Sequence, residues 1–167
     1  MADKDDQALD SWLALLQARE LIAGRLSDTL ERDAGQPLSY FEVLIHLAAA
    51  EGGSMRMVDL AETVLLSKSG VTRLVDRLEA DGLVERQSCP GDRRAINATI
   101  TPAGRAALKR ALPVHTRALD EIFADHLTVA ELKALQALLG KVLSANGKRL
   151  DTCSIVATPS EARARAG

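Results

Sequence analysis

The sequence predicts a mainly α-helical fold with one small β-hairpin, and three observations support this prediction. Apolar residues recur at helical spacing over most of the 167-residue chain. Within residues 83–100, apolar and polar residues alternate instead, on either side of Pro90-Gly91. Hydrophobic residues make up 47% of the chain but aromatic residues only 2%. A packed core is therefore expected, built mostly from Leu, Val and Ala.

The first expected element is a long amphipathic helix over residues 9–32. Its apolar positions are Leu9, Trp12, Leu13, Leu16, Ala23, Leu26 and Leu30. Gly35-Gln36-Pro37 ends it. Ser39-Tyr40-Phe41-Glu42 then has the form of a capping box, which predicts a second helix opening at Ser39 and running to about Ala50. Glu51-Gly52-Gly53-Ser54 stops this second helix.

Two short helices joined by a tight turn follow. The first covers Met57–Val64, and Ser67 is the expected N-cap of the second, which covers residues 68–80. Asp81-Gly82 supplies the turn at its end. One face of the second helix is apolar, with Val71, Leu74, Val75 and Leu78. The opposite face carries Lys68, Ser69, Thr72, Arg73, Asp76 and Glu79, with Arg77 near its edge.

A β-hairpin and two further helices complete the predicted fold. The strands are residues 83–87 and 96–100, joined by a turn over 89–94. Thr101-Pro102 begins a helix that Pro113 is expected to kink or split. Thr128-Val129-Ala130-Glu131 is a second capping box, opening a helix to about Leu143. Residues 150–167 are small, polar and aperiodic, and are expected to form a mobile tail.

The distribution of charge points to an anionic partner for the central segment. The formal net charge is −2, but residues 1–66 carry 5 basic and 12 acidic side chains whereas residues 67–110 carry 9 basic and 5 acidic ones. A basic region of this kind steers an anion to one surface. A helix, a tight turn, a second helix and a hairpin with arginines at its tip form a winged helix-turn-helix pattern, in which the second helix fits the major groove of DNA.

The central motifs also resemble a known family. Ser67–Arg86, then Asp92-Arg93-Arg94, then Thr101-Pro102-Ala103-Gly104 occur in an order and spacing similar to the MarR family of bacterial transcriptional regulators. With the flanking helices, the resemblance covers about residues 9–146. One departure is Leu65-Leu66, because many members have a glycine in that turn.

The resemblance implies a homodimer with intertwined terminal helices and two winged helix-turn-helix lobes on a pseudopalindromic operator. It implies the following DNA contacts: Ser67, Ser69, Gly70, Thr72, Arg73 and Arg77 from the recognition helix, and Arg93 and Arg94 from the wing, with Asp92 orienting Arg94. Lys68 and Arg86 complete the expected set. For Arg77 and Arg86, pairing with nearby acidic residues is the alternative. The matching division of the chain is a dimerisation helix (1–38), a DNA-binding lobe (39–101), dimerisation helices (102–149) and a tail (150–167).

The expected function is a cytoplasmic repressor that a small phenolic or other aromatic ligand releases from double-stranded DNA. Trp12, Tyr40 and Phe41 are the candidate ligand-binding residues, although packing explains Trp12 equally well. The alternatives are a winged-helix module that binds an acidic protein and a redox-sensing regulator that uses Cys89. We expect no enzyme activity, cofactor, metal site or membrane segment, because the chain has no matching motif and Cys89 and Cys153 lack zinc-finger spacing.

Overall fold

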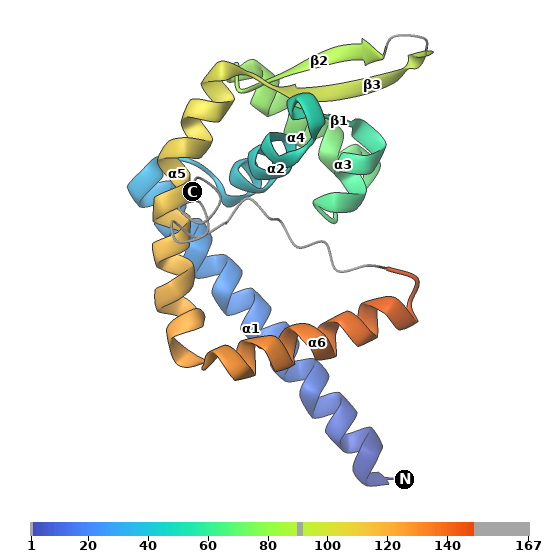
Figure 1. The fold of residues 1–167 in the computed structure, drawn as a ribbon, viewed down its shortest axis with the longest axis vertical. Helices are drawn as coiled ribbons and strands as arrows, with labels where there is room; N and C mark the ends of the chain where they lie inside the picture. Colours follow the sequence, from blue (N-terminus) through green and yellow to red (C-terminus); the bar gives the residue numbers. More distant parts are fainter. Residues whose placement is uncertain (1, 90–91, 149–167) are drawn as a thin grey trace, which may run out of the picture. The chain divides into compact units, whose positions relative to one another are not determined.

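The computed structural model describes residues 2–89 and 92–148, with the backbone alone described at Ala2, Cys89 and residues 92–95. These residues form two compact units (Figure 1). The helical unit contains the chain up to Leu38 together with Arg110–Leu135. The sheet unit contains Ser39–Lys109 together with the described residues from Gln136 onward. The mainly helical fold with a small wing is confirmed.

Helix α1 (Ala2–Ala34) begins seven residues before the predicted start at residue 9. Asp3 and Asp5 lie in its first turn, where negative charge interacts favourably with the helix dipole. At its C-terminus Gly35 has a φ of +62° and its N–H donates to the carbonyl of Glu31, while the N–H of Gln36 donates to the carbonyl of Leu30. The predicted end of the helix at this glycine is confirmed.

Helix α5 (Pro102–Ile122) runs through Pro113 as one element, so of the two predicted effects the split is wrong and the kink stays a prediction. A proline inside a helix removes one backbone hydrogen bond and costs about 3 kcal/mol. Leu108, Ala111 and Ala118 are buried on the two sides of Pro113. We attribute the continuity of α5 to this packing, which local sequence signals do not report.

Helix α6 (Val129–Ala145) follows a short 3-10 helix, η2 (Ala124–His126). The capping box predicted at Thr128 is confirmed. The Thr128 hydroxyl accepts a hydrogen bond from the N–H of Glu131 at 3.3 Å, and the Glu131 carboxylate accepts one from the N–H of Thr128 at 2.7 Å. The bond from the Thr128 N–H, followed by one that the Thr128 hydroxyl donates to the same carboxylate at 2.7 Å, holds the pKa of Glu131 below its usual value.

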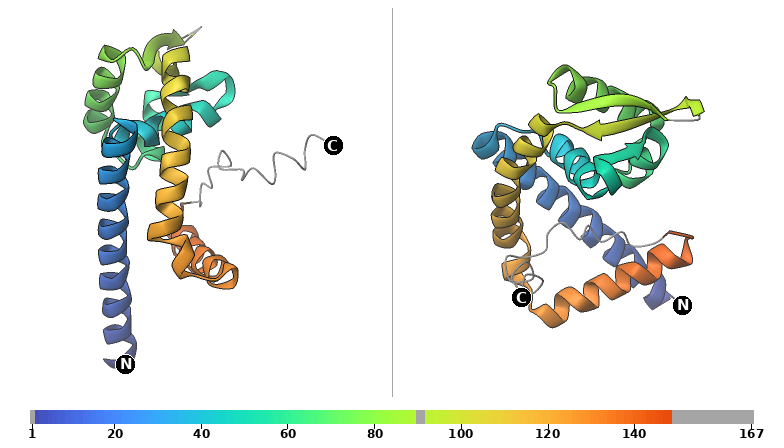
Figure 2. Two further views of the ribbon diagram at one scale, coloured as in Figure 1. Left: turned by 90° about the vertical axis from the view of Figure 1, so that its left-hand side faces the viewer. Right: turned by 45° about the horizontal axis from the view of Figure 1, so that its top comes forward.

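The sheet unit begins with α2 (Leu38–Ala49), which starts one residue before Ser39. The prediction of Ser39 as the N-cap is therefore wrong, and Ser39 lies in the first turn. The unit continues with η1 (Glu51–Gly53), β1 (Ser54–Arg56), α3 (Met57–Thr63), α4 (Lys68–Ala80), β2 (Val84–Cys89) and β3 (Asp92–Ile100). The strands β2 and β3 extend as a ribbon beyond the helices of this unit (Figure 2).

The sheet has three antiparallel strands in the order β1-β3-β2, whereas the sequence predicted the β2-β3 hairpin alone. β1 is only three residues long, and no alternation is readable over so short a segment. Gly52 and Gly53, with φ of +65° and +74°, turn the chain so that Ser54 pairs with Thr99. The hydroxyls of Ser54 and Thr99 are hydrogen-bonded at 2.9 Å.

The end of α4 and the start of α5 are joined by hydrogen bonds of Thr101. The Thr101 hydroxyl caps α5 by accepting from the N–H of Gly104 at 3.0 Å, and it donates to the carbonyl of Gly82 at 2.7 Å. The N–H of Thr101 donates to the carbonyl of Leu83 at 3.1 Å. A Cβ on Gly104 would lie 2.1 Å from that same carbonyl, so this close approach requires glycine.

The core of the sheet unit is aliphatic, as its composition predicted. Its buried hydrophobic side chains are Phe41, Val43, Leu44, Ile45, Leu47, Leu60, Ala61, Val71, Leu74, Val75, Leu78, Val84, Ala98, Ile100, Ala107 and Leu108. Four of these lie on α4. That helix is therefore fixed by its apolar face and presents its polar face to solvent.

Candidate nucleic-acid interface

The turn before α4 is unusually tight. Leu65 has a φ of +54°, the left-handed region that favours glycine, and its side chain is 87% exposed. The N–H of Leu66 donates to the carbonyl of Ala61 at 3.0 Å, which closes the turn. The departure from the family pattern at Leu65-Leu66 therefore leaves the turn in place but puts a leucine in a strained conformation.

Ser67 is the N-cap of α4, as predicted, and its hydroxyl accepts from the N–H of Gly70 at 3.0 Å. The Ser67 and Ser69 hydroxyls lie 3.2 Å apart. A Cβ on Gly70 would lie 3.1 Å from the Ser67 hydroxyl, so glycine fits this cap best. The N-terminus of this 13-residue helix therefore presents two hydroxyls where the helix dipole favours anions.

The exposed face of α4 carries five of the eleven predicted DNA-contacting residues, namely Lys68, Ser69, Thr72, Arg73 and Arg77. The Thr72 hydroxyl donates its proton to the carbonyl of Lys68 at 2.8 Å. It can therefore meet a base edge as an acceptor or through its methyl group. Arg73 and Arg77 supply the multiple donors that suit a phosphate or a guanine edge.

Arg86 is held differently from the other predicted contacts. Its guanidinium pairs with Asp76 at 2.6 Å and with Glu79, and also donates to the carbonyl of Thr72 at 3.2 Å. All three partners belong to α4. The structure thus realises the alternative raised for Arg86, pairing with acidic neighbours, and leaves its side chain 22% exposed.

The wing residues Asp92, Arg93 and Arg94 lie in β3 by their backbone. The pairing of β2 with β3 shifts register between Ser88 and Cys89, and Cys89 then pairs with Asp92. The side chains of Cys89, Asp92, Arg93 and Arg94, as well as Pro90-Gly91, lie outside the described part of the chain, as do Cys153 and the expected tail. Their roles remain predictions.

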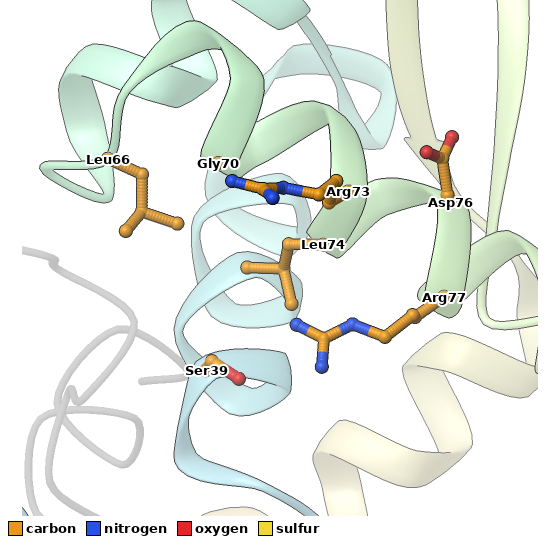
Figure 3. A pocket seen from close by; sticks show the side chains of 7 residues that line it. All are labelled: Ser39, Leu66, Gly70, Arg73, Leu74, Asp76 and Arg77. Atoms are coloured by element: carbon orange, nitrogen blue, oxygen red, sulfur yellow. The ribbon is translucent and has the colours of Figure 1, made fainter.

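A surface cavity of about 690 Å³ lies between α4 and the start of α2. It is lined by Ser39, Leu66, Gly70, Arg73, Leu74, Asp76 and Arg77 (Figure 3). The side chain of Leu74 lies between the guanidinium groups of Arg73 and Arg77, and the Asp76 carboxylate points away from both. The cavity thus combines an apolar floor with two cations. Sequence reasoning did not include Ser39 or Leu66 in a site, because only the fold brings α2 beside α4.

The candidate ligand residues occupy three different environments. The Tyr40 hydroxyl donates to the Asp81 carboxylate at 2.9 Å, and burial, followed by this bond, raises the pKa of Tyr40. Phe41 is buried in the core of the sheet unit. Trp12 belongs to α1 in the helical unit and is 54% exposed. Phe41 thus packs in the core, and the ligand roles of Trp12, Tyr40 and Phe41 stay predictions.

The described residues lack two features that mark other classes of protein. No helix there is long and apolar enough to cross a membrane. No three His, Cys, Asp or Glu side chains in the same residues gather in a way that could hold a metal ion.

The chain is similar to known proteins over most of its length. A model described as MarR family matches residues 34–95. An uncharacterized HTH-type transcriptional regulator of Bacillus cereus is 29% identical over 131 residues, which cover 78% of this chain and 85% of the relative. The transcriptional repressor MprA of Escherichia coli is 30% identical over 104 residues, which cover 62% of this chain and 58% of MprA.

Solved structures agree with this comparison. AbsC, a MarR family transcriptional regulator from Streptomyces coelicolor, superposes with a TM-score of 0.78 at 29% identity, covering 84% of this chain and 94% of AbsC. A second MarR family regulator from that organism, solved in complex with DNA, gives 0.75 at 33% identity, covering 79% and 86%. BpsR of Bordetella bronchiseptica, whose DNA binding is regulated by 6-hydroxynicotinic acid, gives 0.70 at 26% identity, covering 80% and 98%.

Proposed function

Because this chain belongs to the MarR family of transcriptional regulators, we propose that it binds a pseudopalindromic operator as a homodimer and represses transcription there. The observation that carries the proposal is the exposed face of α4, where a capped N-terminus with two hydroxyls is followed by Thr72, Arg73 and Arg77. These groups suit the major groove, and the β2-β3 ribbon suits the adjacent backbone or minor groove. MprA is a transcriptional repressor, and the simplest way for a DNA-bound dimer to repress is to block access to the promoter.

The exposed apolar side chains of the helices support the homodimer. On α1 these are Leu9, Trp12, Leu13, Leu15, Leu16 and Leu21, and on α6 Val129, Leu138 and Val142. Exposed apolar side chains in this number are costly in water, and a symmetric second copy is the economical way to bury them. Two recognition helices in one dimer then match two half-sites about one helical turn apart.

Release by a small aromatic acid is the regulatory part of the proposal. The cavity beside α4 supports it, because Arg73 and Arg77 line that cavity and are also predicted DNA contacts. A ring over Leu74 with a carboxylate between the two guanidinium groups would withdraw both arginines from DNA. The ligand shifts the equilibrium between DNA-bound and DNA-free protein only by as much as its affinity for the DNA-free protein exceeds its affinity for the DNA-bound protein.

The operator hypothesis is tested with a fluorescent duplex from the chain's own upstream region and a shuffled duplex of equal composition. We expect tighter binding to the first, and an affinity that falls with salt by about 0.9 log units per log unit for each phosphate contacted. Arg94→Ala is expected to weaken binding while the dimer persists in sedimentation. Equal affinity for both duplexes would rule the proposal out.

Ligand release is tested with a panel of substituted benzoic acids in a thermal-shift assay, followed by displacement of the bound duplex. An acid that binds is expected to raise the melting temperature of the wild type, because it binds the folded state alone. Arg77→Ala should lose this shift, and Arg110→Ala, an exposed arginine on α5, should keep it. If no acid both binds and displaces DNA, the ligand part of the proposal is wrong.

A further inference from the structure

We propose that Arg86 is a positioning residue that ties β2 to the recognition helix and covers two carboxylates of that helix, and that it does not itself contact DNA. This inference rests on the proposed DNA-binding function and assigns a role within it. It begins from the place of Arg86 as the third residue of β2, directly after α4 and its terminal turn.

The donors of Arg86 are directed at α4. One terminal nitrogen donates to the Glu79 carboxylate, and the other donates to the Asp76 carboxylate at 2.6 Å and to the Thr72 carbonyl at 3.2 Å. Glu79 also accepts from the backbone N–H of Arg86 at 3.2 Å. A guanidinium in which both terminal nitrogens are bonded within the protein has few donors left for phosphate. If the guanidinium left these bonds to contact DNA, the Asp76 and Glu79 carboxylates would lose the cation that pairs with them.

The contacts add a polar link between α4 and β2, which also meet through their buried side chains, among them Leu78 and Val84, and through the turn that joins them. Asp76 and Glu79 are three residues apart on α4 and therefore lie on one side of the helix. Arg86 bridges both to the strand, so the orientation of the β2-β3 ribbon relative to α4 has an anchor in addition to the turn at Gly82. Binding DNA with a helix and a wing together requires this orientation to be fixed before the encounter.

Charge is the second part of the argument. Asp76 and Glu79 have side chains 55% and 41% exposed, on the same helix as Arg73 and Arg77. Carboxylates at a DNA-facing surface repel phosphates, and like-charge contacts at an interface are costly. Arg86 places its positive charge between these two carboxylates. The helix then meets DNA with the charges of Arg73 and Arg77 unopposed.

A mutant cycle separates positioning from direct contact. Operator affinity is measured for wild type, R86Q, the D76N/E79Q double variant and the triple variant that combines them. We expect R86Q to weaken binding about tenfold in the wild-type background and less than about twofold in the D76N/E79Q background, because its partners are then already neutral. The matched control is R73Q, on the exposed face of α4, which should cost the same in both backgrounds.

Amide hydrogen exchange of the DNA-free protein provides a readout independent of DNA. R86Q should accelerate exchange in β2, β3 and the last turn of α4, and R73Q should leave it unchanged. If R86Q folds poorly, E79Q serves in its place. It removes the ion pair between Glu79 and Arg86 from the helix side, and we expect it to accelerate exchange in the same segments. Failure of the wild type to prefer its operator would overturn the proposed function, while the exchange experiment would still decide whether Arg86 anchors the ribbon.

Two results would overturn the inference. One is an equal loss of affinity from R86Q in both backgrounds, which identifies a direct contact to DNA. The other is an exchange pattern in R86Q and E79Q that matches the wild type throughout β2 and β3, which means that the ribbon is held without these ion pairs.

Discussion

Arg73 and Arg77 share one helix face and line one cavity, yet they can have separate tasks on DNA (Figure 3). Arg73 lies nearer the N-terminal end of α4, the end that reaches base edges in helix-turn-helix complexes. Such contacts are worth about 1–3 kcal/mol of discrimination when the arginine binds a guanine edge with two hydrogen bonds. The two roles are separable by measuring specificity as well as affinity.

Arg73→Ala is expected to lower the preference for the operator over shuffled DNA by about 1–3 kcal/mol and to change binding to shuffled DNA less. Anisotropy titrations with both duplexes measure this difference. Arg110→Ala, exposed on α5, serves as the control and should leave the preference unchanged. A uniform loss with both duplexes would identify Arg73 as a phosphate contact instead.

His115 on α5 makes the stability of the protein sensitive to acid. Burial lowers the pKa of His115 in the folded state, so the unfolded chain binds a proton that the folded chain resists. The contribution is complete above the unfolded pKa of about 6.5 and is lost as the pH falls below it.

We therefore expect the urea midpoint of the wild type to fall more steeply between about pH 7.5 and 5.5 than that of His115→Gln, at one fixed protein concentration. His126→Gln changes an exposed histidine and should retain the wild-type dependence. Parallel pH profiles for the wild type and His115→Gln would show that His115 does not link protonation to folding.

Among the elements, the turn between α3 and α4 carries backbone strain at Leu65. A left-handed conformation costs a residue with a Cβ about 1–2 kcal/mol, and glycine is free of that cost. Leu65 is 87% exposed, so its side chain contributes little burial in return. Because α4 begins directly after this turn, relief of the strain at Leu65 should appear as a change in the free energy of unfolding.

Leu65→Gly is expected to raise the free energy of unfolding by up to about 1 kcal/mol, since relief of strain outweighs the added entropy of the unfolded chain. Chemical denaturation at fixed protein concentration measures the change. Leu66→Gly provides the matched control, because Leu66 is less exposed and has no positive φ, and it should destabilise. A lower stability for Leu65→Gly would mean that the leucine makes a compensating contact in the assembled protein.

The elements also show where sequence signals suffice. Thr128 and Ser39 both head an S/T-x-x-E pattern, yet only Thr128 is the cap. The ring of Pro37 fixes its φ near the helical value, and α2 begins directly after it at Leu38. Ser39 therefore lies inside the helix and cannot be its N-cap. The caps at Ser67 and Thr101, and the terminal turn at Gly82, were predictable because their chemistry is local. The strand β1, the continuity of α5 and the partners of Arg86 depend on tertiary packing, which one sequence does not report.

For the whole molecule, the amount of exposed apolar surface matters more than any single contact. Trp12, Leu13 and Leu16 are each exposed by two-fifths or more on α1. Burying one leucine contributes about 1.5–3 kcal/mol, and a symmetric dimer gains this at two places for every residue. Operator binding and stability should then both depend on protein concentration.

Leu13→Glu is expected to shift the protein from dimer to monomer in sedimentation velocity and to weaken operator binding by more than tenfold, because a charge replaces an apolar side chain at the proposed interface. Gln7→Glu adds the same charge at an exposed polar position on the other side of α1 from Leu9, Leu13 and Leu16, and should leave the dimer intact. A Leu13→Glu protein that stays dimeric would place the interface away from this part of α1.

The hydrogen bonds of Thr101 with the carbonyls of Gly82 and Leu83 close the base of the hairpin, where the chain has left α4 and enters α5. Length added to or removed from the far end of the hairpin changes its reach without displacing either helix. We therefore expect that wings of different length can be exchanged on this scaffold while α4, the proposed major-groove reader, stays as it is. The Gly104 contact with Leu83 makes the attachment point itself the least tolerant part of the unit.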